Sequence, residues 1–315
     1  MPRPFRFGLN TFGVKSLAAW KELARKAEDQ GYSTLSVADH TFTPLAPLAS
    51  LAMSAAFTNR LRLGTYVLGN DFWHPTIIAR EAATIDLLSE GRLELGIGSG
   101  WRKGDYSERG LPFDPPGVRI ERLEEAVCLI KQLFSGEPQS FSGKYYTTGG
   151  LVSQPTPVQR PHPPILIGGG GRRMLSLAAR HADIVSLNLR TTSDGGLDFS
   201  SLTAEATLEK VGWVRAAAGE RFAQLELNNP VFDVTITQDR EGAAARFLKG
   251  WGPLGAGINP AELLGSPHVI IGSVEQIVDD LQMRRERFGL SYITLLGGMP
   301  YPDAFAPVVA RLAGT

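Results

Sequence analysis

Cysteine is almost absent from this sequence, and long apolar runs are missing altogether. The 315 residues hold a single cysteine, so no internal disulfide can form. The start of the chain lacks the apolar run of a signal peptide, and no uncharged apolar stretch approaches the ~18 residues that cross a bilayer. These absences predict a soluble protein in a reducing cytoplasm, with no membrane partner.

The one cysteine, Cys128, carries no sign of a chemical role. It lies in a stretch with helical periodicity, on the same side as Leu123, Val127 and Ile130. A free thiol in such a position behaves as a small hydrophobic side chain. We therefore expect Cys128 to be buried in the core.

An excess of either charge is also missing. Lys and Arg number 32, as do Asp and Glu, so the formal net charge is zero. A chain without a basic field does not gather the phosphates of nucleic acid or of an anionic membrane. The five histidines are scattered singly, without the spacing of metal ligands. We therefore expect no nucleic-acid partner and no metal site.

What the chain does contain is a regular alternation of short apolar runs with segments of helical periodicity. This alternation is typical of parallel β/α construction. Eight runs can be counted, and eight strands predict a closed (β/α)8 TIM barrel. The expected strands are residues 5–10, 33–39, 61–68, 92–98, 164–169, 182–189, 224–236 and 291–296.

Two segments fall outside this alternation, at about 135–162 and 238–268. The first is rich in Gly, Pro and Ser, and its prolines can neither continue a helix nor pair in a central strand. We expect it to form an irregular excursion near the barrel mouth. Neither segment resembles an independent domain. The prediction is a single domain over 1–315, with insertions near the C-terminal face of the barrel.

Barrel enzymes carry their chemistry where the strands end, so these positions are the candidates for a site. The second expected strand ends in Asp39 and His40. A histidine at the junction of a strand and a polar loop can move protons near neutral pH. We expect His40 to face a cofactor or substrate, with a structural role in capping the loop as the alternative.

Glycine clusters follow the fourth and fifth expected strands. The second cluster, Gly168, Gly169, Gly170 and Gly171, opens a helix, so its amide groups could hold a phosphate while Arg172 or Arg173 adds charge. Relief of crowding between strand and helix is the alternative. Neither cluster has the Gly-x-Gly-x-x-Gly spacing of a dinucleotide fold, and Gly98-Ser99-Gly100 lacks the spacing of a nucleophile elbow.

Several motifs occur together in the order typical of one family. Their residues are 36–40, 62–65, 91–98, 163–169 and 271–273. As a set they resemble the luciferase-like monooxygenase superfamily, over nearly the whole chain. Within it, the segments 112–117 and 284–289 are most similar to oxidoreductases that use the deazaflavin coenzyme F420.

The resemblance implies roles for particular residues. Asp39 and His40 match a dipeptide that lines the reactive face of the cofactor, which makes His40 the candidate general acid/base. The bond between Tyr66 and Val67 matches a non-proline cis peptide that backs the cofactor ring. Other positions implied to approach the cofactor are Ser99, Gly100, Gly169, Gly170 and Gly171.

One position departs from the family pattern. Trp101 stands where F420-dependent sugar-phosphate dehydrogenases of this superfamily have an acidic glutamate, and an indole cannot donate a proton in that way. A hexose phosphate is therefore disfavoured. An apolar wall at Trp101, with Phe12 and Trp73 nearby, predicts a less polar organic substrate, although these aromatics could instead be barrel packing.

The expected function is hydride transfer between F420 and a small molecule containing a carbonyl, imine or activated alkene, with His40 handling the proton. An FMN-dependent monooxygenase is one alternative. A flavin-binding or assembly protein without activity is another, since fold does not fix function. Relatives of this kind are often dimers, so a homodimer is expected.

Overall fold

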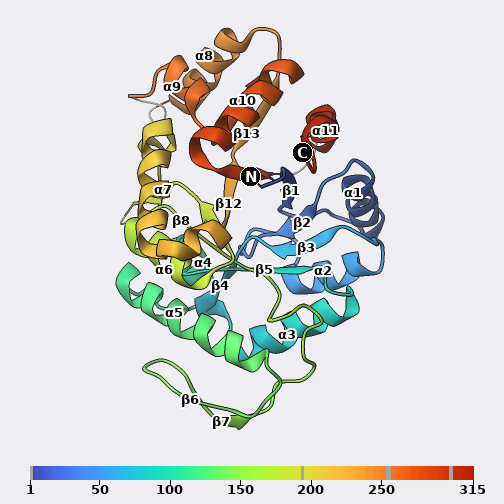
Figure 1. The fold of residues 1–315 in the computed structure, drawn as a ribbon, viewed down its shortest axis with the longest axis vertical. Coiled ribbons are helices and arrows are strands. Elements are labelled where there is room, and N and C mark those ends of the chain that lie inside the picture. Colours follow the sequence, from blue (N-terminus) through green and yellow to red (C-terminus); the bar gives the residue numbers. More distant parts are fainter. Residues whose placement is uncertain (1–2, 193–194, 253–256, 298–300) are drawn as a thin grey trace.

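The computed structural model describes residues 3–192, 195–252, 257–297 and 301–315. Its centre is a parallel sheet closed on itself (Figure 1). Each strand pairs with its neighbours in parallel, and the pairing of β3 with β5 completes the ring. The barrel strands are β1 (Arg6–Thr11), β2 (Thr34–Val37), β3 (Arg62–Thr65), β5 (Leu93–Gly98), β8 (Ile165–Gly169), β9 (Ile184–Leu187), β12 (Glu226–Val231) and β15 (Leu290–Leu296). The predicted eight-stranded barrel is confirmed.

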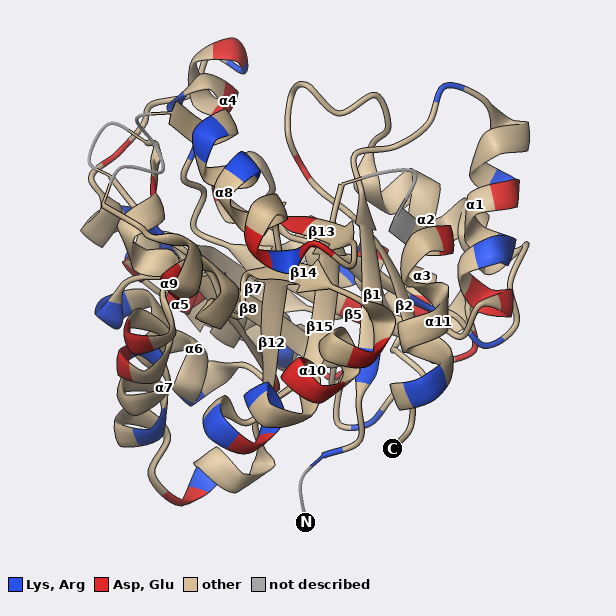
Figure 2. Cartoon of the chain, turned by 90° about the horizontal axis from the view of Figure 1, so that it is seen from above, with Lys and Arg blue, Asp and Glu red and all other residues tan. Residues whose placement is uncertain are grey.

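Helices cover the outside of the barrel, with acidic and basic residues mixed along them (Figure 2). The long ones are α1 (Leu17–Asp29), α2 (Pro47–Ala55), α3 (Pro75–Leu88), α5 (Pro116–Leu133), α6 (Arg172–His181), α7 (Ala204–Ala218), α10 (Val274–Phe288) and α11 (Tyr301–Leu312). Local sequence sets their ends. The side chain of Ser16 caps α1, Ser273 and Gln276 form a capping box on α10, and Gly289 ends α10 in a left-handed conformation.

The first insertion is more regular than the sequence suggested. It contains a hairpin of β6 (Gln139–Ser142) and β7 (Thr147–Leu151), which lies beside α5 (Figure 1). The Glu125 carboxylate accepts hydrogen bonds from the backbone N–H groups of Lys144, Tyr145 and Tyr146. This acceptor on α5 orders the turn, so the expected irregular excursion is wrong for this part of the segment.

The second insertion forms a lobe at one end of the molecule, at the top of Figure 1. It contains α8 (Arg240–Trp251) and α9 (Pro260–Gly265). The expected strand 224–236 divides: β12 stays in the barrel, and β13 (Asp233–Ile236) pairs with β14 (Val269–Gly272). The lobe has its own apolar cluster, made of Leu189, Leu202, Ala243, Ala244, Leu263, Val269 and Ile271. Residues 253–256 of this insertion lie outside the described residues.

Cys128 is only partly buried, in contrast to Leu123, Val127 and Ile130 on the same helix. Its Sγ lies 4.0 Å from Nδ1 of His181, at the boundary between α5 and α6. The expectation of a core position was therefore wrong. The polar ring of His181 reaches this boundary, while burial raises the pKa of the thiol and keeps it protonated.

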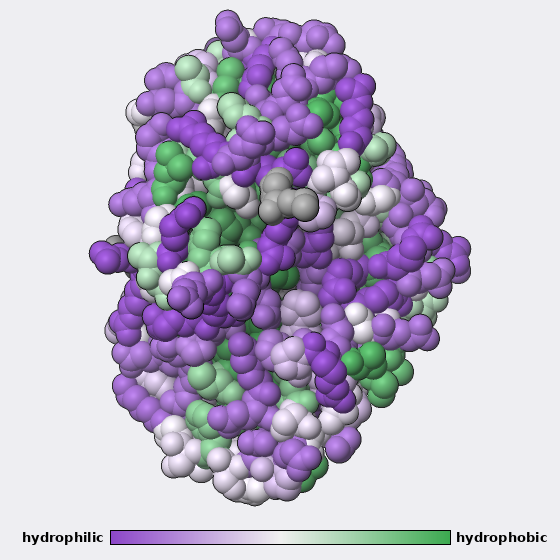
Figure 3. Space-filling model, in the orientation of Figure 1, coloured by the Kyte–Doolittle hydropathy of each residue, from purple (hydrophilic) through white to green (hydrophobic). Residues whose placement is uncertain are grey.

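Two further observations concern the surface. The face in Figure 3 is mostly hydrophilic, with small apolar patches separated by polar residues. Among the described residues, no helix combines the length and apolar character required to cross a membrane.

A charged cluster fills the barrel at the N-terminal ends of the strands. The Glu94 carboxylate, only 3% exposed, accepts hydrogen bonds from Arg6 and Arg62, both at 2.6 Å. The Tyr292 hydroxyl donates to its other oxygen at 3.1 Å. Although burial alone would raise the pKa of Glu94, the charges and hydrogen bonds of the two arginines lower it.

We predict that Glu94→Gln lowers the free energy of unfolding by about 3 kcal/mol, because Arg62 loses its carboxylate partner and Arg6 keeps only Glu226. Urea denaturation at neutral pH measures this loss. The lowered pKa of folded Glu94 means that its stabilisation is present above the ordinary carboxylate pKa and disappears as the pH falls through the folded value. The difference between wild type and variant should therefore shrink in acid.

Glu275→Gln is the matched control, because Glu275 pairs with Arg311 at the surface. Its loss should cost much less stability than the loss of Glu94, because the pair is exposed to solvent. Equal effects of the two substitutions would contradict a special role for the Glu94 cluster.

Candidate active site at the barrel mouth

The predicted site residues follow four neighbouring barrel strands. In order around the ring, β2, β3, β5 and β8 are followed by Asp39, the Tyr66–Val67 bulge, Ser99 and the glycine turn at 168–171. Because the carboxyl ends of parallel strands meet at one rim, these segments form a continuous arc along half of the barrel mouth. The structure thus brings the candidates together.

Asp39 is engaged entirely by the protein. It is 7% exposed, and its Oδ2 accepts hydrogen bonds from the backbone N–H of Gly69 at 3.2 Å and from Trp73 Nε1 at 2.8 Å. Its Oδ1 accepts one from Arg109 at 3.0 Å. Asp39 therefore holds the loop after β2 to its neighbours. The indole of Trp73, a candidate substrate contact, is directed at this carboxylate and packs against the core.

His40 stands between an aromatic surface and a buried carboxylate. Its ring stacks on Phe42 at 4.8 Å between centroids and meets Trp101 edge-on at 5.9 Å. Phe42 in turn contacts Phe12 at 5.7 Å. Phe12 and Phe42 are 38% and 55% exposed, so apolar rings face solvent beside His40. We call Phe12, Phe42 and Trp101 the aromatic wall.

The carboxylate beside His40 belongs to Asp105, in the short helix α4 (Lys103–Glu108). Its Oδ2 lies 2.7 Å from Nδ1 of His40, and its Oδ1 accepts hydrogen bonds from Thr41 and Arg102. Burial would raise the pKa of Asp105, but the hydrogen bonds from His40 and Thr41 lower it overall. Asp105 is therefore ionised at neutral pH.

The peptide bond between Tyr66 and Val67 is cis, as the family resemblance implied. The Tyr66 hydroxyl reaches the barrel interior, 2.7 Å from Ser186 Oγ and 2.8 Å from Asn228 Oδ1. Burial raises the pKa of this phenol, which remains a neutral donor. Val67 packs so closely on Gly98 that a Cβ there would lie 2.8 Å from Val67 Cγ2. The bulge is thus held from inside the barrel.

The Ser99–Gly100 backbone is fixed from behind by two residues. Gly100 has a φ of +70°, and a Cβ there would lie 2.1 Å from the Tyr106 hydroxyl, so only glycine fits. Tyr106 donates to the Ser99 carbonyl at 3.1 Å. The buried Arg119 donates to the carbonyls of both Ser99 and Gly100. The backbone of this loop is therefore held in place at the mouth, and Gly100 adds no side chain to it.

The glycines at 168–171 differ in role, and a Cβ on Gly168 would make only an ordinary contact with Ser186 Cβ at 3.4 Å. A Cβ on Gly169 would lie 2.4 Å from Met174 Cγ, and one on Gly170 would lie 2.1 Å from the Leu189 carbonyl oxygen. These two relieve crowding, which was the alternative interpretation. Gly171 faces open space and begins α6, where no side chain caps the first turn. The adjacent Arg172 is exposed and has no ion pair among the described residues, so this end of α6 can receive an anion.

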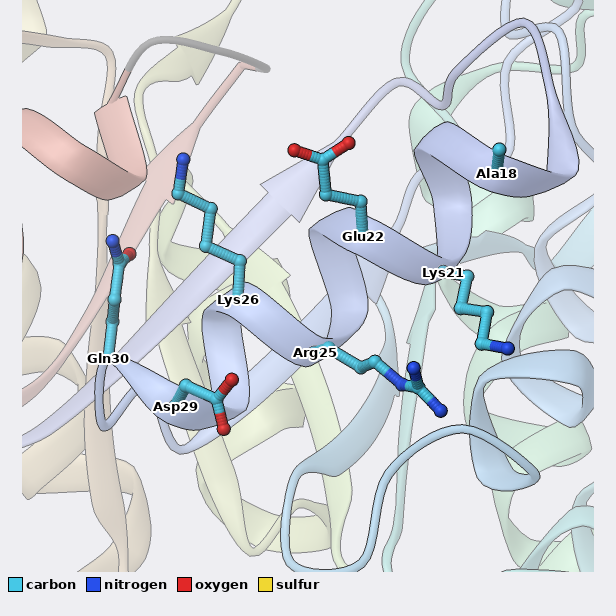
Figure 4. Close-up of a pocket in the computed structure, with 7 residues that line it drawn as sticks. All are labelled: Ala18, Lys21, Glu22, Arg25, Lys26, Asp29 and Gln30. Atoms are coloured by element: carbon cyan, nitrogen blue, oxygen red, sulfur yellow. The ribbon is translucent and has the colours of Figure 1, made fainter.

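A surface hollow along α1 lies outside this arc. Ala18, Lys21, Glu22, Arg25, Lys26, Asp29 and Gln30 line it, and their polar ends do not converge on one point (Figure 4). Lys26 and Gln30 are also occupied, since both bind the Asp303 carboxylate of α11. We therefore keep the barrel mouth as the candidate site.

Comparison with known proteins decides the family. The model of the family described as luciferase-like monooxygenase matches residues 5–266. The chain belongs to this family. An F420-dependent glucose-6-phosphate dehydrogenase of Kribbella flavida is 31% identical over 263 residues, which cover 79% of this chain and 73% of that protein. The first mycobacterial relatives, 32% identical over 184 residues, are matched over 64% of their own length and 51% of this chain.

Members of the luciferase-like monooxygenase family differ in cofactor. An FMNH2-dependent dimethylsulfone monooxygenase of Pseudomonas putida is 34% identical over 128 residues, covering 41% of this chain and 35% of that protein. The coenzyme F420-dependent tetrahydromethanopterin reductase from Methanopyrus kandleri superposes with a TM-score of 0.77 at 19% identity, covering 98% of both chains. The second match establishes a shared fold.

The residues that the sequence did not reveal lie mainly in and beside α4. Asp105, Tyr106 and Arg109 contact His40, Ser99 and Asp39, respectively. In the sequence, residues 99–117 look like a Gly- and Pro-rich connection between a strand and the next long helix. Its one usable signal was an acidic and a basic residue four positions apart, Asp105 and Arg109, which is a helical spacing. Phe42 was missed because it lies within a polar loop.

We predict that alanine substitution of two neighbouring glycines changes stability to very different extents. Gly170→Ala should destabilise the protein by about 1 to 3 kcal/mol, because the added methyl overlaps the Leu189 carbonyl. Gly171→Ala should change stability by about 0.5 kcal/mol or less, since its Cβ meets open space. Denaturant unfolding of both variants tests the assignment, which fails if Gly171→Ala proves the more damaging.

Proposed function

We propose that this protein is an oxidoreductase that uses coenzyme F420 to transfer a hydride to or from a small organic molecule. The observation that carries the proposal is the arrangement of His40. It lies at the barrel mouth between a buried carboxylate and the aromatic wall, on the same arc as the open N-terminus of α6. Family membership and F420-dependent relatives support this assignment.

The residues present fit a deazaflavin with a phosphorylated tail. The uncapped first turn of α6 and the free guanidinium of Arg172 offer donors and positive charge to a phosphate. The Ser99–Gly100 edge would lie along the cofactor, and the Tyr66–Val67 bulge would support its ring. When bound, the deazaflavin would supply or accept the hydride.

His40 is the residue that would move the proton. Asp105 occupies its Nδ1, so Nε2 is the ring nitrogen left for a substrate oxygen or nitrogen. In reduction Nε2 would donate a proton to the substrate, and in oxidation it would accept one. The rings of Phe42 and Trp101 border this position and would exclude water from it.

The aromatic wall favours an apolar substrate with one reactive polar group. Phe12, Phe42 and Trp101 offer ring faces and edges beside His40. Ketones, imines and activated alkenes fit this description. Sugar phosphates fit it poorly, because their hydroxyl groups would be left without partners on this wall.

An FMN-dependent monooxygenase is the second candidate, supported by the FMNH2-dependent relative. The two candidates predict different cofactor affinities. Titration of the purified protein with F420, FMN and FAD, followed by fluorescence, distinguishes them. Tight binding of FMN together with no binding of F420 would favour the monooxygenase.

Arg172→Ala should weaken F420 binding about tenfold, equivalent to about 1.4 kcal/mol, because one charge-assisted contact to the phosphate is lost. Arg180→Ala is the matched control, since Arg180 lies at the other end of α6 and pairs with Glu124. The control should bind F420 like wild type. Equal affinity of both variants would place the phosphate elsewhere.

His40→Ala should slow hydride transfer by about 100-fold or more while leaving F420 affinity unchanged, because the proton route is lost and the anion site is intact. Single-turnover oxidation of reduced F420 by 2-cyclohexen-1-one, measured across pH, provides the rate. A variant with the full wild-type rate at every pH would show that His40 has no part in the proton transfer.

A further inference from the structure

The two oxygens of the Asp105 carboxylate have separate partners. Oδ2 contacts Nδ1 of His40 at 2.7 Å. Oδ1 accepts hydrogen bonds from Thr41 N at 3.1 Å, from Thr41 Oγ1 at 3.0 Å and from Arg102 at 2.9 Å. Three donors therefore fix the plane of the carboxylate, and one oxygen is reserved for the histidine.

The carboxylate is also shielded from water. Asp105 is 3% exposed, and Arg109, 4.0 Å from Oδ1, is the second cation beside it. A hydrogen bond from an imidazole to an ionised, buried acceptor is strong and directional. The neighbouring Asp39 does not accept a hydrogen bond from His40, because its oxygens already accept hydrogen bonds from Gly69, Trp73 and Arg109.

We propose that Asp105 is a positioning residue that keeps a proton on Nδ1 of His40 and thereby directs a proton-accepting Nε2 toward the barrel mouth. This inference rests on the proposed function for its catalytic consequence. An ionised carboxylate has only acceptor sites, so a neutral His40 must carry its proton on the nitrogen that faces Asp105. When Nε2 takes a second proton, the same carboxylate stabilises the imidazolium.

Arg109 extends the arrangement to the other half of the dipeptide. It donates to Asp39 at 3.0 Å, lies 4.0 Å from Asp105, and its guanidinium carbon stands 4.0 Å from the centre of the Phe72 ring. Arg109 thus links the carboxylate of Asp39 to that of Asp105, which in turn contacts His40. Movement of α4 would displace Asp39 and His40 together.

Asp105→Asn provides a test that a purely structural role would not satisfy. The three donors around Oδ1 require an acceptor, so the amide oxygen of the variant takes that position and its NH2 group faces His40. An amide NH2 donates, so Nδ1 of His40 must become the acceptor and the proton moves to Nε2. The substitution therefore inverts the tautomer while preserving shape.

The first measurement is the two-bond proton–nitrogen correlation spectrum of the histidine rings, recorded at alkaline pH on the 15N-labelled protein. Comparison with His40→Gln assigns the His40 signals. We expect the proton on Nδ1 in the wild type and on Nε2 in Asp105→Asn. A proton on Nε2 in the wild type, or an unchanged tautomer in the variant, overturns the positioning role.

The second measurement is single-turnover oxidation of reduced F420 by the activated alkene 2-cyclohexen-1-one. Asp105→Asn should slow this step by about 100-fold or more with little change in F420 affinity, because the reduced alkene takes its proton from the imidazolium of His40 and an amide does not stabilise that cation. Glu124→Gln is the matched control, because it also removes a carboxylate from a histidine ring, that of His181, away from the arc of candidate residues. It should leave the rate unchanged.

The two measurements separate the two hypotheses. If the tautomer inverts while Asp105→Asn and His40→Ala retain the wild-type rate, Asp105 still positions the ring but His40 has no part in the proton transfer. If the tautomer inverts and the wild type does not oxidise reduced F420, the proposed function fails. If Asp105→Asn unfolds, Asp105→Glu keeps the charge and should retain the Nδ1 proton. Loss of that proton in Asp105→Glu, in a folded protein, also overturns the positioning role.

Discussion

Closure of the parallel sheet is the constraint on which the candidate site depends. The pairing of β3 with β5, with Leu63 opposite Leu93 and Gly64 opposite Glu94, joins the two ends of the strand order. A Cβ on Gly64 would lie 3.3 Å from Thr34 Cγ2 and 3.4 Å from Ser36 Cβ, so glycine leaves room for these side chains of the neighbouring strand. Because all strands run the same way around a closed ring, their carboxyl ends lie at one rim, and residues that are far apart in the sequence lie on one arc.

The two ends of this barrel use polar groups differently. At the N-terminal ends of the strands, the Glu94 carboxylate accepts hydrogen bonds from Arg6, Arg62 and Tyr292. Arg6 also binds Glu226, so these charged groups have partners within the protein. At the mouth, most polar groups are also satisfied by protein. Among the described residues, the groups at the mouth without a protein partner include Nε2 of His40, the first turn of α6 and the guanidinium of Arg172, and these are the groups that the proposed function uses. The site is thus recognised by which groups remain available, not by how many polar groups are present.

The sequence predicted the elements governed by local pattern and missed those governed by long-range contacts. Eight apolar runs gave the eight strands, and residues at strand ends gave Asp39, His40 and the glycine turn. The hairpin at 139–151 depends on Glu125, which is remote from it in sequence. Likewise Asp105, the partner of His40, is 65 residues away in a six-residue helix, whose sequence has no apolar periodicity that would predict a helix. The division of the expected strand 224–236 follows from β14, whose pairing no local signal indicates.

The lobe built from α8, α9, β13 and β14 has an apolar cluster of its own, which Leu189 and Leu202 complete from outside the lobe, whereas Ile270 of β14 belongs to the barrel cluster. Substitutions of Ala243, Leu263 or Ile271 would therefore disturb the packing of the lobe cluster first. Substitutions can therefore accumulate in the lobe cluster while the strands of the barrel keep their packing. In this architecture, divergence among homologues should accumulate in the lobe faster than at the rim that carries His40.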